Sequence, residues 1–154
     1  MRTPAIQLSV RAAVAAALAW WIADALHAHY AIYALIAAVL VTDLSPANSR
    51  RLALQRLAGT LVGAMVGALL LPWLDIRAIA LGVAILAAML LAFALRLENA
   101  GARVAGYVAA IVMLAHGDDA WQYAFDRAWE TIVGIGVALL VGLVPLWMRE
   151  RRTK

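Results

Sequence analysis

The sequence lacks cysteine altogether and is poor in charge, with 14% Asp, Glu, Lys and Arg over 154 residues. The absence of cysteine excludes disulfides, thiolate metal sites and cysteine nucleophiles. A charged content this low, beside 66% hydrophobic residues, excludes an ordinary soluble domain. His27 and His29 are too few ligands for a metal site, and the sequence contains no nucleophile–base pairing or phosphate-binding glycine loop. We therefore expect neither an enzyme nor a cofactor.

Apolar segments of near membrane-spanning length fill most of the chain. A helix needs roughly 20 mostly apolar residues to cross a bilayer, and six segments come close to that length. The predicted spans are about 8–26, 28–44, 57–74, 78–95, 100–116 and 128–148. Because five spans follow the first, we interpret the first as an uncleaved helix rather than a signal peptide. The sequence predicts an all-α membrane protein, with one domain of six transmembrane helices over residues 1–154.

Basic residues concentrate in every second gap between these spans. With both termini in the cytoplasm, only Arg77 and Arg127 among the 13 Lys and Arg residues would lie outside. Short cytoplasmic loops of membrane proteins are enriched in Lys and Arg, so the pattern predicts an N-in, C-in topology. The arginines form no single basic stripe, so we expect the lipid bilayer and not nucleic acid as the partner that explains the net charge of +4.

The third and sixth spans begin with similar sequences. The pattern Arg56-x3-Thr60-x2-Gly63-x3-Gly67 matches Arg127-x3-Thr131-x2-Gly134-x3-Ala138. Tyr33 and Tyr107 give the second and fifth spans a fainter likeness. Three helices per half would give the halves opposite orientations, and inverted repeats are a recurrent plan of secondary transporters. An inverted 3+3 repeat is one interpretation, and chance similarity over so few positions is the other.

Small residues spaced by four form a stripe on both of these spans. The predicted packing residues are Gly59, Gly63 and Gly67 on the third span and Gly134, Ala138 and Gly142 on the sixth. Such stripes let helix backbones approach closely in lipid. They predict packing seams, either inside the helix bundle or between protomers.

Two arginines and two threonines beside these stripes are candidate substrate ligands. We expect Arg56 and Arg127 at helix N-termini, with Thr60 and Thr131 one turn further along. A helix N-terminus and a guanidinium group together favour an anion, and arginine can hold a carboxylate with two parallel hydrogen bonds. Alternatively, local carboxylates such as Asp43 pair with the arginines, or their side chains extend to lipid head groups.

Glu130 is the candidate residue for proton coupling. It lies near the apolar body of the sixth span, beside Thr131 and close to Arg127. Asp126 and Glu130 are also the carboxylates nearest in sequence to Arg127, so either could neutralise that arginine instead.

Four segments resemble a known group, the fusaric acid resistance (FUSC) and aromatic acid exporter proteins. RLAGTLVG at 56–63 looks like the group's R-x-x-GT-x-x-G signature, and RAWETIVG at 127–134 resembles its R-x-x-ET-x-x-G. HYAIYA at 29–34 is similar to its PYWA segment but lacks the proline and the tryptophan, and RVAGYVAA at 103–110 fits the start of its fifth helix. The segments follow one another in the family's order along nearly the whole chain.

The resemblance implies a multi-pass protein of the bacterial inner membrane that exports aromatic carboxylic acids with the proton gradient. In Gram-negative cells such exporters work with a periplasmic adaptor. Longer members carry two membrane units and a cytoplasmic domain, whereas this chain has one unit, so we expect a homo-oligomer. We predict a transporter unit for small aromatic or other organic anions. The alternative is a non-transporting subunit or scaffold that binds a partner through its glycine-lined helices.

Overall fold

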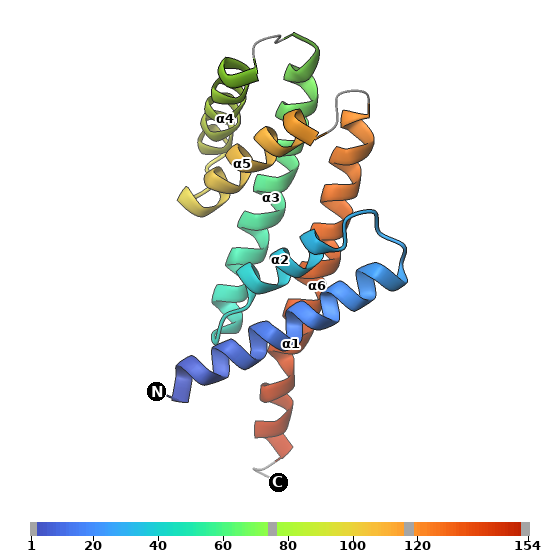
Figure 1. Ribbon diagram of the computed structural model, residues 1–154. Helices are drawn as coiled ribbons and strands as arrows, with labels where there is room; N and C mark the ends of the chain where they lie inside the picture. The colour runs from blue at the N-terminus through green and yellow to red at the C-terminus, as the bar shows by residue number, and fades with distance from the viewer. Residues whose placement is uncertain (1–2, 74–76, 116–118, 152–154) are drawn as a thin grey trace. The chain divides into compact units, whose positions relative to one another are not determined.

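The computed structural model describes residues 3–73, 77–115 and 119–151, and these ranges contain helices and no strand. The helices are α1 (Thr3–Ala25), α2 (Ile32–Val41), α3 (Pro46–Leu70), the 3-10 helix η1 (Leu71–Trp73), α4 (Arg77–Ala94), α5 (Asn99–Ala115) and α6 (Ala120–Arg151) (Figure 1). The predicted all-α class is thus confirmed for the described residues. Residues 74 and 116, where the third and fifth predicted spans end, lie outside them.

Two segments of the described chain, Pro4–Ala25 and Pro46–Leu70, are long and apolar enough to cross a membrane. In contrast, α2 has only 10 residues, whereas the predicted second span covers 28–44. A helix of that length extends about 15 Å, roughly half of the hydrocarbon core of a bilayer. The six-span topology therefore stays a prediction.

The third helix begins at Pro46 and not near Leu57 as predicted. Proline is well tolerated in the first turn of a helix, where its missing N–H has no intrahelical partner to lose. The Asp43 carboxylate accepts hydrogen bonds from the Ser45 N–H at 2.8 Å and from the Asn48 side chain at 3.0 Å. Residues 46–56, which lie between the second and third predicted spans, therefore form the first turns of α3.

The sixth helix also begins earlier than predicted. It runs from Ala120 to Arg151, so the aromatic residues Trp121, Tyr123 and Phe125 belong to its first turns. Arg127 consequently lies within α6, and the prediction that α6 begins at Arg127 is wrong. Neither Arg127 nor Arg56 is at a helix N-terminus. The effect of the helix dipole fades within the first turn, so the dipole contributes little at either position.

The chain folds into two compact units, and both are discontinuous in sequence. The first comprises Met1–Ala53 with Glu130–Lys154, and the second comprises Leu54–Trp129. In the first unit α1 and α2 pack against each other, and in the second α4 packs against α5 (Figure 1). Each unit thus combines one helix pair with parts of the two long helices, α3 and α6.

In the second unit the glycine stripe of α3 lies directly against α5. A Cβ atom at Gly63 would collide with the carbonyl oxygen of Ala105 and lie 2.9 Å from the Cβ of Val108. Gly59 and Gly67 make equivalent close approaches one turn before and one turn after, to Gly101 and Ala109.

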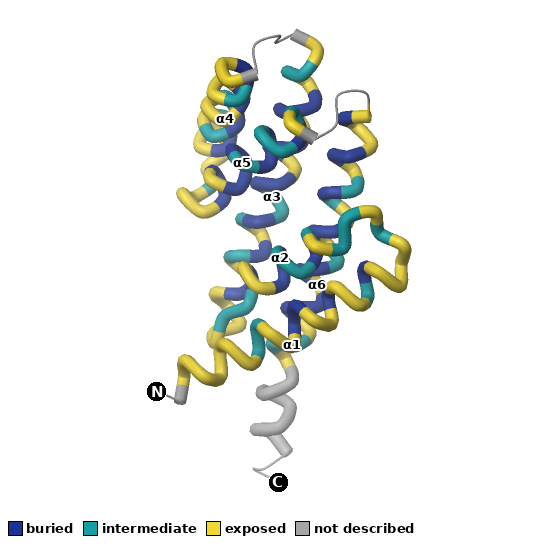
Figure 2. Tube along the Cα trace, viewed as in Figure 1, coloured by how far each residue is buried: buried dark blue, intermediate teal, exposed yellow. Residues whose placement is uncertain are grey.

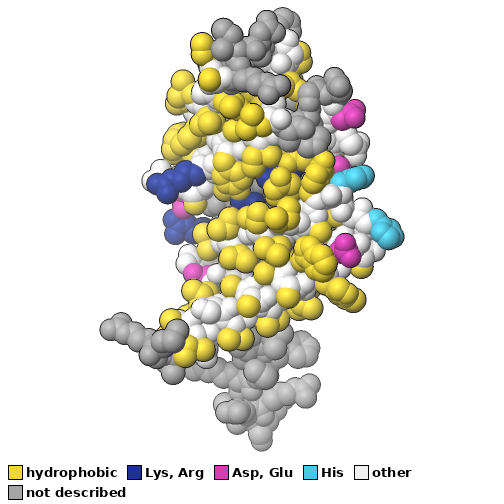
Figure 3. All heavy atoms as spheres, viewed as in Figure 1, with side chains coloured by type: hydrophobic (Ala, Val, Ile, Leu, Met, Phe, Trp, Pro, Cys, Tyr) yellow, Lys and Arg dark blue, Asp and Glu magenta, His cyan; other side chains and the backbone are white. Residues whose placement is uncertain are grey.

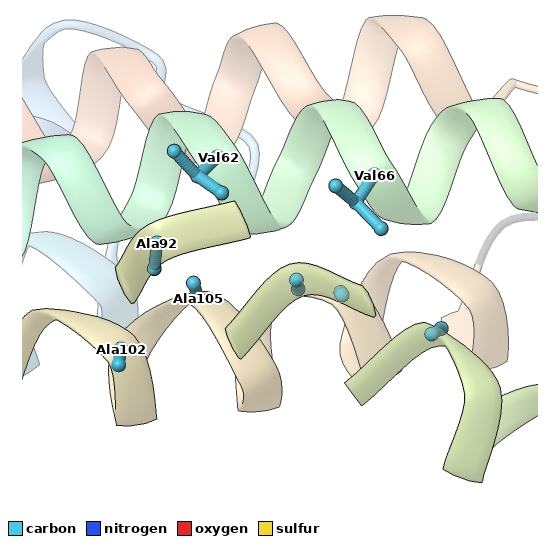
Figure 4. Packing of buried hydrophobic residues seen from close by; sticks show 8 residues of the cluster. Val62, Val66, Ala92, Ala102 and Ala105 are labelled. Carbon is cyan, nitrogen blue, oxygen red and sulfur yellow. The ribbon is translucent and has the colours of Figure 1, made fainter. Parts of the chain in front are cut away.

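Beside this seam, the core of the second unit is built mainly from alanine. Val62 and Val66 of α3 point towards small side chains that include Ala92, Ala102 and Ala105 (Figure 4). Small residues on α4 and α5 leave room for the two valines, so the three helices pack closely.

In the first unit α6 lies against α2 in the same manner. A Cβ atom at Gly134 would collide with the carbonyl oxygen of Ala34 and lie 2.8 Å from the Cβ of Ala37. Gly63 and Gly134 are separated by the same number of residues as Ala34 and Ala105, and as Ala37 and Val108. The two seams therefore share one register. Gly142 differs, because a Cβ atom there would meet nothing within 4 Å among the described atoms.

Helices α1 and α4 also end alike. His27 and Arg96 have φ values of 56° and 63°, in the left-handed region. In both turns the next N–H donates to a carbonyl five residues back, from Ala28 to Ala23 at 2.9 Å and from Leu97 to Ala92 at 3.0 Å. This Schellman-type ending normally uses glycine.

Large apolar side chains remain exposed on the surface of the described residues. Leu54 and Phe125 are each 70% exposed, and Leu140 is 66% exposed. Exposed positions recur along α1 and α4 (Figure 2), and apolar side chains cover much of the face seen in Figure 3. Soluble monomers rarely show apolar surface on this scale, whereas lipid tails are as apolar as leucine, so the surface indicates a membrane environment.

Candidate anion-binding site

Few polar side chains are buried in the described part of the chain. They are Ser49, Arg56, Thr60, Arg127, Glu130 and Thr131. All of them except Ser49 are site residues predicted from the sequence. Burial of a charged group in an apolar surrounding costs folding free energy unless another charge or several hydrogen bonds compensate it. These side chains are therefore the candidates for a binding site.

Arg56 is the central charged residue of the second unit. It is only 3% exposed, and its Cζ atom lies 5.3 Å from the centre of the Tyr107 ring on α5. A guanidinium group at this distance from an aromatic face makes a favourable cation–π contact. However, the buried Nε and Nη1 atoms of Arg56 have no hydrogen-bond partner among the described residues. The ring therefore stabilises the cation, while two of its nitrogen atoms remain available to an acceptor.

Two hydroxyl groups accompany Arg56 in the same unit. Thr60 lies one turn further along α3 and is 0% exposed, and its Oγ1 has no hydrogen-bond partner among the described residues. The same holds for the buried hydroxyl of Tyr107. Because the glycine seam holds α5 close to α3, the aromatic ring from one helix reaches the guanidinium group on the other.

Arg127 adds a second positive charge to the second unit. It is 1% exposed, and its Cζ atom lies 5.9 Å from the centre of the Tyr123 ring, one turn earlier on α6. Arg56 and Arg127 thus place two buried guanidinium groups in the same unit.

The remaining predicted site residues, Glu130 and Thr131, belong to the first unit. Glu130 is 1% exposed, and its Oε1 accepts a 2.6 Å hydrogen bond from the backbone N–H of Tyr30. The hydroxyl of Thr131 is buried without a hydrogen-bond partner among the described residues, as Thr60 is in the second unit. The carboxylate thus ties α6 to the turn that precedes α2.

The carboxylate proposed as a local partner for Arg56 is engaged elsewhere. The Asp43 carboxylate accepts hydrogen bonds from Ser45 and Asn48 at the start of α3. Sequence analysis assigned no role in the site to Tyr107 or Tyr123. Tyr123 lies four residues before Arg127, so helical spacing could have revealed it. For Tyr107, no signal in the sequence gives the register of α5 on α3.

The described residues combine helices, an apolar surface and a few buried charged side chains, as is typical of a membrane protein. Residues 18–141 match the family described as fusaric acid resistance protein-like, and the chain belongs to that family. Comparison with curated proteins and with solved structures gave no match. The family is one of membrane proteins with a transport- or efflux-related function, in agreement with the class that the fold and the site define.

Proposed function

We propose that this chain is a transporter unit of the bacterial inner membrane that exports small organic anions, aromatic carboxylates in particular. The observation that carries the proposal is Arg56, a buried guanidinium group with two nitrogen atoms that lack partners among the described residues. A carboxylate supplies both the negative charge and the acceptor oxygens that this group requires. Thr60 would donate a further hydrogen bond, and Arg127 would strengthen the attraction of the anion.

Glu130 is the residue proposed to couple export to the proton gradient. It is a carboxylate buried within an apolar helix, and the hydrogen bond that it accepts from the Tyr30 N–H ties α6 to the turn before α2 in the first unit. Ionisable groups buried in membrane helices often serve as proton relays. Protonation would weaken the hydrogen bond to the Tyr30 N–H, because a charged acceptor binds an N–H more strongly than a neutral one.

The architecture that we propose for this transporter is an inverted repeat of α1–α3 and α4–α6. Its support is the shared register of the α3–α5 and α6–α2 seams, together with the identical endings of α1 and α4. The repeat places Thr131 at the position of Thr60, and both hydroxyls are buried. Equivalent groups facing opposite sides of the membrane would suit alternating access.

The second hypothesis, a scaffold that binds a partner through its glycine-lined helices, loses its main support. Gly59, Gly63 and Gly67 lie against α5, and Gly134 lies against α2, so helices of the same chain already occupy these seams. A homo-oligomer and a periplasmic adaptor remain part of the proposal, and they would use other surfaces. Gly142 keeps open space but is a single position.

Transport by inverted membrane vesicles tests this function. Vesicles with the wild-type protein should accumulate acids from a panel of radiolabelled aromatic carboxylates, and a protonophore should abolish the accumulation. Arg56→Gln should lower the rate by about tenfold or more, because a buried charge-assisted interaction is lost. Arg103→Gln is the matched control, since Arg103 is an exposed arginine of α5 in the same unit.

Equal rates for Arg56→Gln and wild type, at equal amounts of protein in the membrane, would overturn the assignment of Arg56. No accumulation above that of empty vesicles for any acid in the panel would favour the non-transporting subunit.

A further inference from the structure

We propose that Tyr107 determines the specificity of the Arg56 site, with its hydroxyl donating a hydrogen bond to the anionic group of the substrate. The inference rests on the proposed function and deepens it, because it specifies which form of the substrate the site accepts. The residues that carry it, Arg56, Thr60 and Tyr107, all belong to the second unit.

The position of Tyr107 is set by close packing of two helices. Gly59 brings the α3 backbone against Gly101 and Val104, and Gly63 brings it against Ala105 and Val108. Tyr107 lies on α5 between two contacts of this seam, Ala105 and Val108. Its ring therefore has little freedom to move away from Arg56, 5.3 Å from the ring centre.

The ring and the hydroxyl of Tyr107 have separate roles. The ring makes the cation–π contact, which phenylalanine would retain in large part. The hydroxyl is buried and has no hydrogen-bond partner among the described residues. A buried hydroxyl without a partner destabilises a folded protein, so its presence beside a buried cation indicates that a ligand engages it.

The buried polar atoms of Arg56, Thr60 and Tyr107 that lack partners among the described residues can all donate a hydrogen bond. The Nε and Nη1 atoms of Arg56 can only donate, and the hydroxyls of Thr60 and Tyr107 can both donate as well. A group that accepts at several points and carries negative charge satisfies all of them together. The site thus selects the ionised carboxylate of an aromatic acid and rejects the corresponding neutral amide.

Thermal unfolding of the purified protein, with and without benzoate, tests the role of the hydroxyl. Tyr107→Phe should leave the unfolding temperature of the ligand-free protein unchanged or raise it, because a buried unpaired hydroxyl is removed. The same variant should need about tenfold more benzoate to reach the stabilisation seen in wild type, because a hydrogen bond to a charged group is lost. Benzamide should stabilise neither protein. Tyr33→Phe, which removes a tyrosine hydroxyl from α2, should respond to benzoate as wild type does.

The outcomes separate this inference from the proposed function. If benzoate stabilises wild type but not Arg56→Gln, and Tyr107→Phe responds as wild type, then the role of Tyr107 is overturned and the anion site stands. If Tyr107→Phe lowers the unfolding temperature of the ligand-free protein, the hydroxyl is structural and the inference fails. If benzoate and other aromatic carboxylates fail to stabilise wild type, both the inference and the proposed function fail.

Discussion

Two buried charged residues, Arg56 and Glu130, have separate roles in the proposed function. Arg56 and Glu130 are both almost fully buried, yet they are held in different ways. An aromatic ring lies against Arg56, whereas a backbone N–H donates to Glu130. The first arrangement leaves donors available for a ligand, and the second fixes the position of an acceptor. This difference supports a substrate role for the arginine and a coupling role for the glutamate.

At the residue scale we predict that Glu130 stabilises the protein as an acceptor and not only through its charge. Glu130→Gln keeps an acceptor oxygen for the Tyr30 N–H and should change the unfolding free energy little. Glu130→Ala leaves that N–H without its acceptor and should destabilise by about 1–3 kcal/mol. Chemical or thermal unfolding in detergent measures both variants. Equal destabilisation by the two substitutions would show that the hydrogen bond to Tyr30 is unimportant.

The candidate site residues named from the sequence are buried in the structure, but the reason inferred from the sequence is wrong for two of them. These candidates are predicted from their positions beside the small-residue stripes of the third and sixth spans, and all of them are buried: Arg56, Thr60, Arg127, Glu130 and Thr131. The two arginines are predicted at helix N-termini, which is wrong since α3 and α6 begin well before them. The aromatic partner Tyr107 depends on packing between helices, and no local pattern encodes that contact.

Glycine seams are the main determinants at the scale of the helices. Gly63 and Gly134 let α3 and α6 contact the backbones of α5 and α2. By contrast, Gly136 lies on the open side of α6, where a Cβ atom would meet nothing within 4 Å among the described atoms. Two glycines of the same chain should therefore respond in opposite ways to the same substitution.

We predict that Gly63→Ala destabilises the protein by about 1–3 kcal/mol, because the added methyl group forces α3 away from α5. Gly136→Ala should leave stability unchanged or raise it by up to about 1 kcal/mol, because alanine is the better helix former. The unfolding temperatures of the two variants in the same detergent provide the comparison. A stability loss of similar size at both positions would mean that the seam is not tightly packed.

The start of α3 is a helix boundary that the sequence did not predict correctly. Pro46 falls between the second and third predicted spans, whereas in the structure it occupies the first position of α3, after the turn of Asp43 and Ser45. A proline stops a helix when it lies in the interior but favours one at its start. Local composition around Pro46 does not distinguish the two cases, because polar residues surround it on both sides.

Topology is the main feature at the scale of the whole molecule. The predicted N-in, C-in orientation follows from the arginine distribution, and the inverted repeat requires opposite orientations of the two halves. Because the chain has no cysteine, single cysteines can be introduced without any background reaction. Exposed positions at the helix ends are suitable labelling sites.

We predict that Leu26→Cys and Asp119→Cys react with a membrane-impermeant maleimide from the outside of spheroplasts. Asn48→Cys and Glu98→Cys should react only after the membrane is permeabilised. All four positions are exposed, so their own burial does not limit the reaction. Labelling of Asn48→Cys and Leu26→Cys from the same side would contradict the predicted topology and the inverted repeat with it.

Arg56, with Thr60 and Tyr107 beside it, is proposed to bind an organic anion. Equilibrium binding to the purified protein tests this proposal most directly. Radiolabelled benzoate should bind the purified wild-type protein and Arg103→Gln saturably and with equal affinity. Arg56→Gln should bind it at least about tenfold more weakly, because the buried positive charge is lost. Benzoate binding to Arg56→Gln with wild-type affinity would contradict the account.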